Sequence, residues 1–169
     1  LLIHFGTTHD DTREKTIDVF RKKVESLFPD CDVFEAFTSR MIIKRLKARG
    51  ILRKNPLELL EELKGKGYTH IYVQSSHLLH GIEYENLREE ITSYSSSFEK
   101  IAIGEALLHS VEDYKKIVSA LTSRQSQSSK EAIVYIGHGT EHAANASYPM
   151  MRYVFVQEGH PEYFVGTVE

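Results

Sequence analysis

The sequence predicts an α/β fold with a mostly parallel sheet, and two observations support this prediction. Short apolar runs alternate with longer amphipathic stretches along the chain, which is the pattern of repeated βα units. The chain has 169 residues and a single cysteine, Cys31. A hydrophobic core of ordinary domain size therefore has to hold the fold, because neither a disulfide framework nor a thiolate zinc site can be built.

Four short apolar runs predict the strands of a first lobe. They are residues 1–5, 33–37, 71–74 and 101–103. Each run is followed by a stretch whose apolar residues lie three or four positions apart, as they do on one face of a helix. Asn55 before Pro56 is a typical helix start, with a capping side chain followed by proline in the first turn. We therefore expect a complete N-terminal α/β lobe over residues 1–122.

The segment TSRQSQSS, residues 122–129, is the most linker-like part of the sequence, since small polar residues cannot bury a core. It predicts a linker at residues 123–130. Beyond it, a strand that ends at Ile136, a helix, and a strand around residues 164–168 predict the beginning of a second lobe. We expect this C-terminal lobe, residues 131–169, to be incomplete.

Charge and hydropathy argue against several classes of partner. The chain carries 21 Lys and Arg against 24 Asp and Glu, a formal net charge of −3, which is not the footprint of a nucleic-acid or anionic-membrane binder. No apolar stretch approaches the roughly 20 residues of a membrane span. We expect neither nucleic acid nor a membrane as partner. The lone cysteine favours a reducing, cytoplasmic setting.

Three turns rich in polar and glycine residues follow predicted strands. Their sequences are HFGTTH at residues 4–9, QSSHLLHGIEYE at residues 74–85 and YIGHGTEH at residues 135–142. In open α/β sheets, ligands bind outside the carboxyl ends of the strands. The three turns would therefore converge on one crevice if their strands are neighbours.

His138 is the sharpest candidate for chemistry in these turns. Gly137 and Gly139 on either side allow the backbone to approach a ligand closely, and neutral imidazole is a common ligand of divalent first-row metals. The alternative is a histidine that only satisfies a hydrogen bond in the turn, and the pattern leaves both interpretations open. His142, four residues later, could be a second ligand, although a surface cap is the simpler interpretation.

The middle turn offers a carboxylate. Glu83 could face His138, completing a weak metal site or accepting protons from a substrate nitrogen; alternatively it is a solvated residue at a helix start. For His77 a structural, hydrogen-bonded role is the alternative to substrate binding.

The first turn offers backbone amides and hydroxyls. Gly6, Thr7 and Thr8 precede a predicted helix, an arrangement that suits carboxylate or phosphate groups but also ordinary helix capping. The sequence has no Walker lysine, no GxGxxG fingerprint and no GxSxG elbow, so nucleotide and serine-hydrolase functions lack their motifs.

Five motifs in order resemble one family across nearly the whole chain. HFGTTHDDTREKTI, FEAFTSRMIIKRLK, VQSSHLLHGIEYE, YIGHGTEHAANASY and EGHPEYFVGTVE are similar to segments of the anaerobic cobalt chelatases of cobalamin synthesis, the sirohydrochlorin cobaltochelatases. The resemblance implies a chelatase-like, flavodoxin-like fold of two three-layer α/β lobes with a tetrapyrrole cleft. The implied reaction is insertion of Co²⁺ into sirohydrochlorin or precorrin-2 without a nucleotide, with Ni²⁺ and Fe²⁺ as alternative metals.

The resemblance also implies residue roles. His138 matches the family's metal-binding histidine, which is proposed to accept pyrrole protons, and Glu83 matches the acidic residue across the cleft. We therefore expect both to serve in catalysis and metal binding, and expect the substrate to contact a further set: Gly6, Thr7, Thr8, His77, Gly137 and Gly139.

The resemblance departs from the family pattern at the carboxyl end. Family members continue past the position of Glu169 and carry a second metal-binding histidine there, a role that neither His142 nor His160 inherits. We expect a fragment of a longer enzyme, a truncated product whose missing elements another chain supplies, or a tetrapyrrole- or metal-binding protein without turnover. Apolar surface exposed by an unfinished lobe would favour a homo-oligomer. A flavodoxin-like domain that binds a small anion at Gly6 to Thr8 is a further alternative.

Overall fold

The computed structural model describes residues 1–123 and 131–169, which divide into two compact units. Unit 1 comprises Leu1–His77 and Tyr84–Glu105, and unit 2 comprises Leu78–Glu83 and Ala106–Glu169. The expected boundary lay at 122/123, whereas the chain passes between the units near residues 77, 83 and 105. The expected linker at 123–130 lies, from residue 124 onward, outside the described residues.

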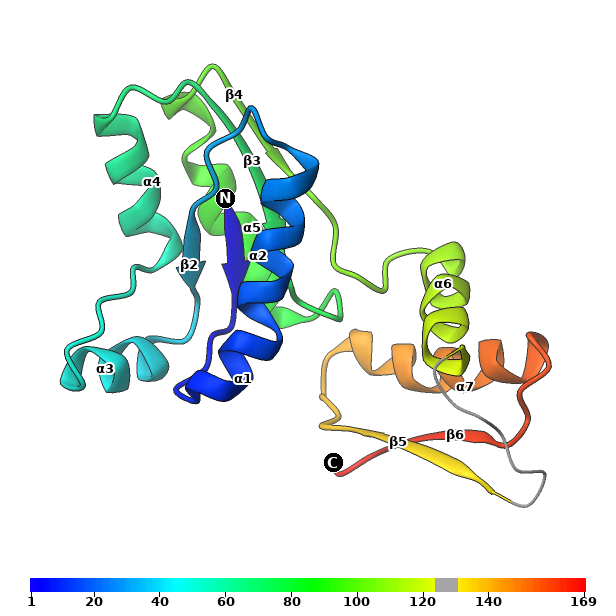
Figure 1. Ribbon diagram of the computed structural model, residues 1–169. Helices are drawn as coiled ribbons and strands as arrows, with labels where there is room; N and C mark the ends of the chain where they lie inside the picture. Colours follow the sequence, from blue (N-terminus) through cyan, green and yellow to red (C-terminus); the bar gives the residue numbers. More distant parts are fainter. Residues whose placement is uncertain (124–130) are drawn as a thin grey trace. The chain divides into compact units, whose positions relative to one another are not determined.

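The sheet of unit 1 has four parallel strands in the order β2-β1-β3-β4 (Figure 1). Their bounds are Leu2–His4 for β1, Glu35–Phe37 for β2, His70–Ser75 for β3 and Lys100–Ile103 for β4. All four lie within or beside the predicted apolar runs. The parallel sheet with flanking helices confirms the predicted α/β, flavodoxin-like class.

The helices of unit 1 cover both faces of this sheet (Figure 1). Their bounds are Asp10–Lys15 for α1, Ile17–Leu27 for α2, Arg40–Ala48 for α3, Pro56–Gly65 for α4, Ile82–Ser93 for α5 and Ser95–Ser97 for the 3₁₀ turn η1. Helices α4 and α5 bury Leu60, Leu63 and Ile91 against Ile3 and Val73 of the sheet. Most of the apolar core of unit 1 therefore lies on this one face.

The start of α4 has the predicted capping arrangement. The Asn55 side chain accepts a hydrogen bond of 2.9 Å from the Glu58 backbone N–H, and the Glu58 carboxylate accepts one of 2.9 Å from the Asn55 N–H. This reciprocal pair satisfies two amides that the first helical turn leaves without intrahelical partners. The Asn-Pro pair in the sequence thus fixes where α4 begins.

The opposite face of the sheet buries a histidine. His4, at the end of β1, is 1% exposed and lies edge-on to Phe20 of α2, with ring centroids 5.9 Å apart. Its Nδ1 is 2.8 Å from the Ser76 hydroxyl, and its Nε2 is 3.8 Å from the half-buried Glu35 carboxylate. Burial, reinforced by the nearby charge of His77, lowers the pKa of His4 from 6.5 to about 4.

Unit 1 is therefore expected to lose stability as the pH falls from about 6.5 to about 4. In this window the unfolded chain binds a proton at His4 that the folded chain refuses, so protonation favours unfolding. Between pH 7 and pH 4.5 the His4 contribution should fall by about 2–3 kcal/mol. The check is urea unfolding of the wild type and of His4→Gln at both pH values. Equal pH dependence in the two proteins would show that His4 is not held neutral by the fold.

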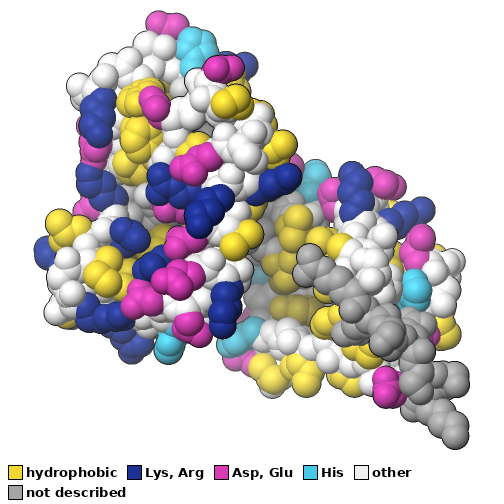
Figure 2. Space-filling model, viewed as in Figure 1, with side chains coloured by type: hydrophobic (Ala, Val, Ile, Leu, Met, Phe, Trp, Pro, Cys, Tyr) yellow, Lys and Arg dark blue, Asp and Glu magenta, His cyan; other side chains and the backbone are white. Residues whose placement is uncertain are grey.

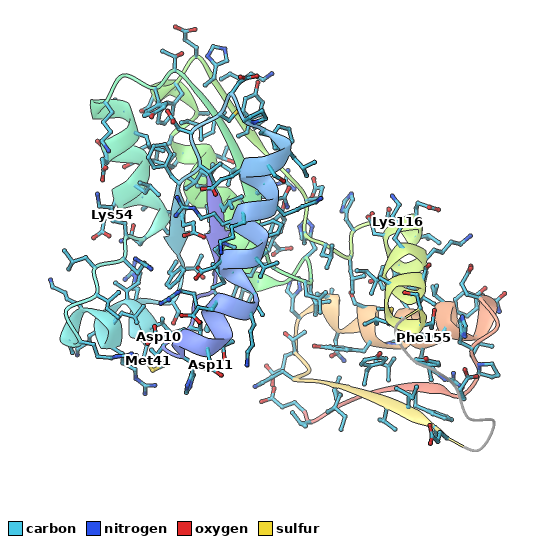
Figure 3. The ribbon with its side chains drawn as sticks, in the orientation of Figure 1. Asp10, Asp11, Met41, Lys54, Lys116 and Phe155 are labelled. Atoms are coloured by element: carbon cyan, nitrogen blue, oxygen red, sulfur yellow. The ribbon has the colours of Figure 1, made fainter. Side chains whose placement is uncertain are left out.

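Unit 2 pairs two parallel strands with two helices on one face. Strand β5, Ile133–Gly137, runs beside β6, Tyr163–Thr167, and the bounds of the other elements are Val111–Thr122 for α6, Ala143–Ala146 for the 3₁₀ turn η2 and Ser147–Gln157 for α7. Phe155 of α7 is fully buried and points toward the sheet (Figure 3). Its ring stacks on Tyr163 at 4.9 Å and on Tyr135 at 5.8 Å between centroids. This aromatic stack fixes β5 and β6 under α7.

The other face of the β5–β6 pair is open in the described part of the chain. Val134, Ile136 and Phe164 are 58%, 68% and 44% exposed, and Val134 and Phe164 are partners in register. Apolar side chains gather along the lower rim of unit 2 in Figure 2, whereas Lys and Arg mix with Asp and Glu over unit 1. Parallel sheets are normally covered on both faces, so this face of the β5–β6 pair lacks the cover that such sheets usually have; the incomplete second lobe stays a prediction.

No helix within residues 1–123 or 131–169 has both the length and the apolar character needed to cross a bilayer.

Candidate metal-handling pocket of unit 2

The candidate site is built where β5 ends. Strand β5 finishes at Gly137, and the following residues run beside the end of β6 because the two strands are parallel and in register. The Val168 N–H donates to the Gly137 carbonyl at 3.1 Å, and the Glu169 N–H donates to the His138 carbonyl at 3.1 Å. The backbone at His138 is thus held by the neighbouring strand end.

The two glycines flanking His138 are required for different reasons. A Cβ at Gly137 would lie 2.1 Å from the ring of Tyr148 in α7. The Tyr148 hydroxyl in turn accepts a hydrogen bond of 3.3 Å from the Gly139 N–H. Gly139 has φ +90°, a conformation that side-chain-bearing residues rarely adopt. Together these contacts fix the turn that presents His138.

Gly137→Ala is expected to destabilise unit 2 by about 1–3 kcal/mol, because the new methyl group overpacks against the rigid Tyr148 ring. The matched control is Gly166→Ala in β6, where a Cβ would meet nothing within 4 Å. That control should be neutral or slightly stabilising. Urea unfolding of both variants measures the difference. Equal stability of the two variants would mean that the close contact between Gly137 and Tyr148 does not exist.

An open pocket of about 600 Å³ surrounds His138. It is lined by Ile82, His138, Gly139, Thr140, Glu141, His142 and Glu169. The His138 side chain is 77% exposed, and its Nδ1 is 3.6 Å from a Glu169 carboxylate oxygen and 3.3 Å from the Gly139 carbonyl oxygen. A carboxylate or carbonyl beside one ring nitrogen orients a histidine and leaves the other nitrogen for a metal or proton. The pocket can therefore hold a metal ion weakly or accept a proton.

His142 serves as a helix cap. Its Nδ1 accepts a hydrogen bond of 3.2 Å from the Ala144 N–H at the start of η2, which agrees with the simpler of its two interpretations. His160 packs edge-on to Tyr163, with ring centroids 5.6 Å apart, and its Nδ1 is 3.7 Å from a Glu162 carboxylate oxygen. Both residues have structural contacts in unit 2, and only His142 lines the pocket.

Glu83 belongs to unit 2 with His138, but the pocket is lined by its neighbour Ile82 and not by Glu83 itself. Its side chain is exposed in the first turn of α5. Glu169 and Glu141 supply the carboxylates that line the pocket, and neither was among the site residues predicted from the sequence. The position of Glu169 beside His138 could have been predicted, because both strands were expected and neighbouring parallel strands end at the same edge of a sheet.

The remaining predicted site residues lie in unit 1. Gly6, Thr7 and Thr8 follow β1, where the Thr7 hydroxyl accepts a hydrogen bond of 3.1 Å from the His9 N–H and the Thr8 carbonyl accepts one from Arg49. His77 follows β3, and its ring and its backbone N–H both contact the Ser75 hydroxyl.

Acidic residues border the Gly6-to-Thr8 turn. Asp10 and Asp11 stand in the first turn of α1 (Figure 3), and Asp10 pairs with Arg49 at 2.9 Å. Asp10 also pairs with Arg13 at 2.7 Å, so the two arginines balance the acidic charge here, and the small-anion alternative stays a prediction.

Comparison with known proteins identifies the family to which this chain belongs. A parallel α/β chain with a histidine and carboxylates at the end of a strand has the general features of a metal-handling α/β enzyme. A family model described as Cobalt chelatase (CbiK) matches residues 1–169, and the chain belongs to this family.

Two curated relatives match over almost the whole chain. One is the sirohydrochlorin cobaltochelatase of Salmonella typhimurium, 36% identical over 171 residues that cover 100% of this chain and 64% of the relative. The other is the sirohydrochlorin cobaltochelatase CbiKC of Nitratidesulfovibrio vulgaris, 31% identical over 172 residues that cover 99% of this chain and 60% of the relative. The chain thus spans less than two thirds of the length of these relatives.

Proposed function

We propose that this chain inserts Co²⁺ into sirohydrochlorin, or into its precursor precorrin-2, as the names of its relatives suggest. The observation that supports this most directly is the exposed His138 imidazole beside Glu169 in an open pocket at the end of β5. The pocket offers a base and a metal ligand together, in reach of solvent and of a large substrate.

Metal insertion needs both a base and a weak metal ligand. Metal insertion removes two protons from pyrrole nitrogens while a divalent ion leaves its protein ligands for the macrocycle. A neutral imidazole can accept one such proton, and a nearby carboxylate stabilises the imidazolium that forms. A single histidine with a carboxylate holds Co²⁺ weakly, which favours its release to the substrate. We assign these two roles to His138, with Glu169 as the orienting carboxylate.

The proposed function also involves residues other than His138 and Glu169. Glu83 is proposed as a second acidic group for metal and protons. Gly137 and Gly139, together with the unit 1 residues Gly6, Thr7, Thr8 and His77, are proposed as substrate contacts. Ni²⁺ and Fe²⁺ are proposed as alternative metals, and no nucleotide is required. A homo-oligomer and a cytoplasmic location stay predictions.

The test uses the difference in length between this chain and its relatives. The chain, and a chimera in which residues 1–169 replace the matched part of the Salmonella relative, are mixed anaerobically with sirohydrochlorin and Co²⁺. Insertion is followed by absorbance against the spontaneous rate and against the relative itself. We expect the chimera to exceed the spontaneous rate.

A folded chimera that stays at the spontaneous rate, while the relative is active, would contradict the proposal. If that chimera still shifts the spectrum of sirohydrochlorin without metal, the chain is a tetrapyrrole-binding protein without turnover. Activity of the chain alone would show that residues 1–169 suffice.

A further inference from the structure

Residues 78–81 and 106–110 of unit 2, which lie outside its helices and strands, are tied together by a backbone hydrogen bond. The Leu108 N–H donates a hydrogen bond of 2.9 Å to the Leu78 carbonyl. Leu108 is 6% exposed and belongs to the core of unit 2, against which Leu79 also packs. The backbone of both segments is therefore anchored by the buried Leu108 and the partly buried Leu79.

Each anchored segment carries one histidine. His80 follows Leu79, and His109 lies between the buried Leu108 and Ser110, the N-cap of α6. Ser110 is itself fixed by a capping box: its N–H donates to the Asp113 carboxylate at 2.9 Å, and its hydroxyl accepts from the Asp113 N–H at 3.3 Å. Both histidine backbones are thus held in place before any ligand binds.

The two rings meet. Their centroids are 6.3 Å apart with the planes inclined by 30°, and a ring nitrogen of each lies within 4.8 Å of one of the other. Two nitrogens bound to one metal at about 2.1 Å lie about 3.0–3.4 Å apart when they occupy neighbouring positions. His109 is exposed and His80 half-buried, so binding of one ion by both rings requires the His109 side chain to rotate toward His80.

An acidic side chain stands four residues after His109. The Asp113 carboxylate accepts hydrogen bonds from the Ser110 N–H at 2.9 Å and from the Ser110 hydroxyl at 2.7 Å, which hold it at the start of α6. Neutral imidazoles near a carboxylate are the ligand environment that Co²⁺, Ni²⁺ and Zn²⁺ prefer over oxygen-only sites.

We propose that His80 and His109 form a binding site for a divalent first-row metal ion, separate from the pocket at His138, which neither of them lines. Unit 2 then holds metal at two positions. The site itself is independent of chelatase activity; only the identity of its natural ion as Co²⁺ rests on the proposed function.

The test follows histidine ring protons by NMR during addition of Co²⁺ alone. The chain has nine histidines, whose signals are assigned with single His→Gln variants. Substoichiometric Co²⁺ should broaden the His80 and His109 signals together. In equilibrium dialysis, His80→Gln and His109→Gln should each weaken this site about tenfold or more, since each removes one of two protein ligands, and the double variant should bind one equivalent less.

Controls separate this inference from the proposed function. His70→Gln removes an exposed histidine of unit 1 and should leave the number of bound ions unchanged. If the double variant binds as much Co²⁺ as wild type, and Co²⁺ does not broaden the His80 and His109 signals of the wild type, the site does not exist. That result would not contradict metal insertion by His138. Conversely, a His138 variant that inserts no metal but still binds Co²⁺ at His80 and His109 would contradict the proposed function and not the second site.

Discussion

Replacing His138 by alanine should reduce Co²⁺ insertion to the spontaneous rate, a loss of about 10²–10⁴-fold wherever insertion is catalysed. The imidazole is the one ring in the pocket without a capping role, because the His142 ring accepts the Ala144 N–H. Its removal takes away both the base and the metal ligand. The measurement is the initial rate of absorbance change with sirohydrochlorin and Co²⁺, in the chain and in the chimera.

The fold should tolerate this change. The His138 side chain is 77% exposed, so stability should stay within about 0.5 kcal/mol of wild type. His70→Ala removes another exposed histidine and should keep the full rate. A His138→Ala variant with the wild-type insertion rate would exclude His138 as base and ligand, whatever the rest of the pocket does.

The second large effect concerns the core that supports the pocket. Phe155→Ala should destabilise unit 2 by about 3–5 kcal/mol, since it empties a fully buried aromatic position whose ring stacks on both Tyr135 and Tyr163. Tyr135 belongs to β5, the strand that leads into the His138 turn. Urea unfolding measures the loss, and hydrogen exchange of the β5 and β6 amides assigns it to unit 2.

The matched control lies two residues earlier on the same helix. Tyr153 is 57% exposed, and Tyr153→Ala should change stability by no more than about 0.5 kcal/mol. Exchange in β1 and β3 of unit 1 should be unaffected by either substitution. Equal losses from the two variants would show that α7 does not face the sheet through Phe155.

Most of the fold could be predicted from local patterns. Each strand is a short apolar run between turn residues, and helix starts such as Asn55-Pro56 carry their own caps. The division into units could not be predicted in this way. The polar segment after α6 predicts that this helix ends the first lobe. In the structure, however, Tyr114 and Val118 of α6 pack into the core of unit 2. Such assignments depend on contacts between distant residues, which periodicity does not encode.

Only part of the candidate site could be predicted from the sequence. The glycines around His138 marked a special turn, and the structure supplies the reason in the Tyr148 ring and the positive φ of Gly139. The partner carboxylate was not found, because Glu169 is distant in sequence and becomes a neighbour only through the register of β5 and β6. The roles of Glu83 and His77 came from resemblance and stay predictions.

The most direct test of metal handling in unit 2 is an anomalous diffraction map at the cobalt absorption edge, from crystals of the chain soaked with Co²⁺. We predict a peak at the His138 imidazole, at a metal–nitrogen distance of about 2.0–2.2 Å, with a further peak between His80 and His109. In crystals of His138→Ala the first peak should vanish and the second remain. Cobalt bound elsewhere on the chain, with none at His138 in a pocket open to solvent, would contradict the assignment of the pocket as the metal-handling site.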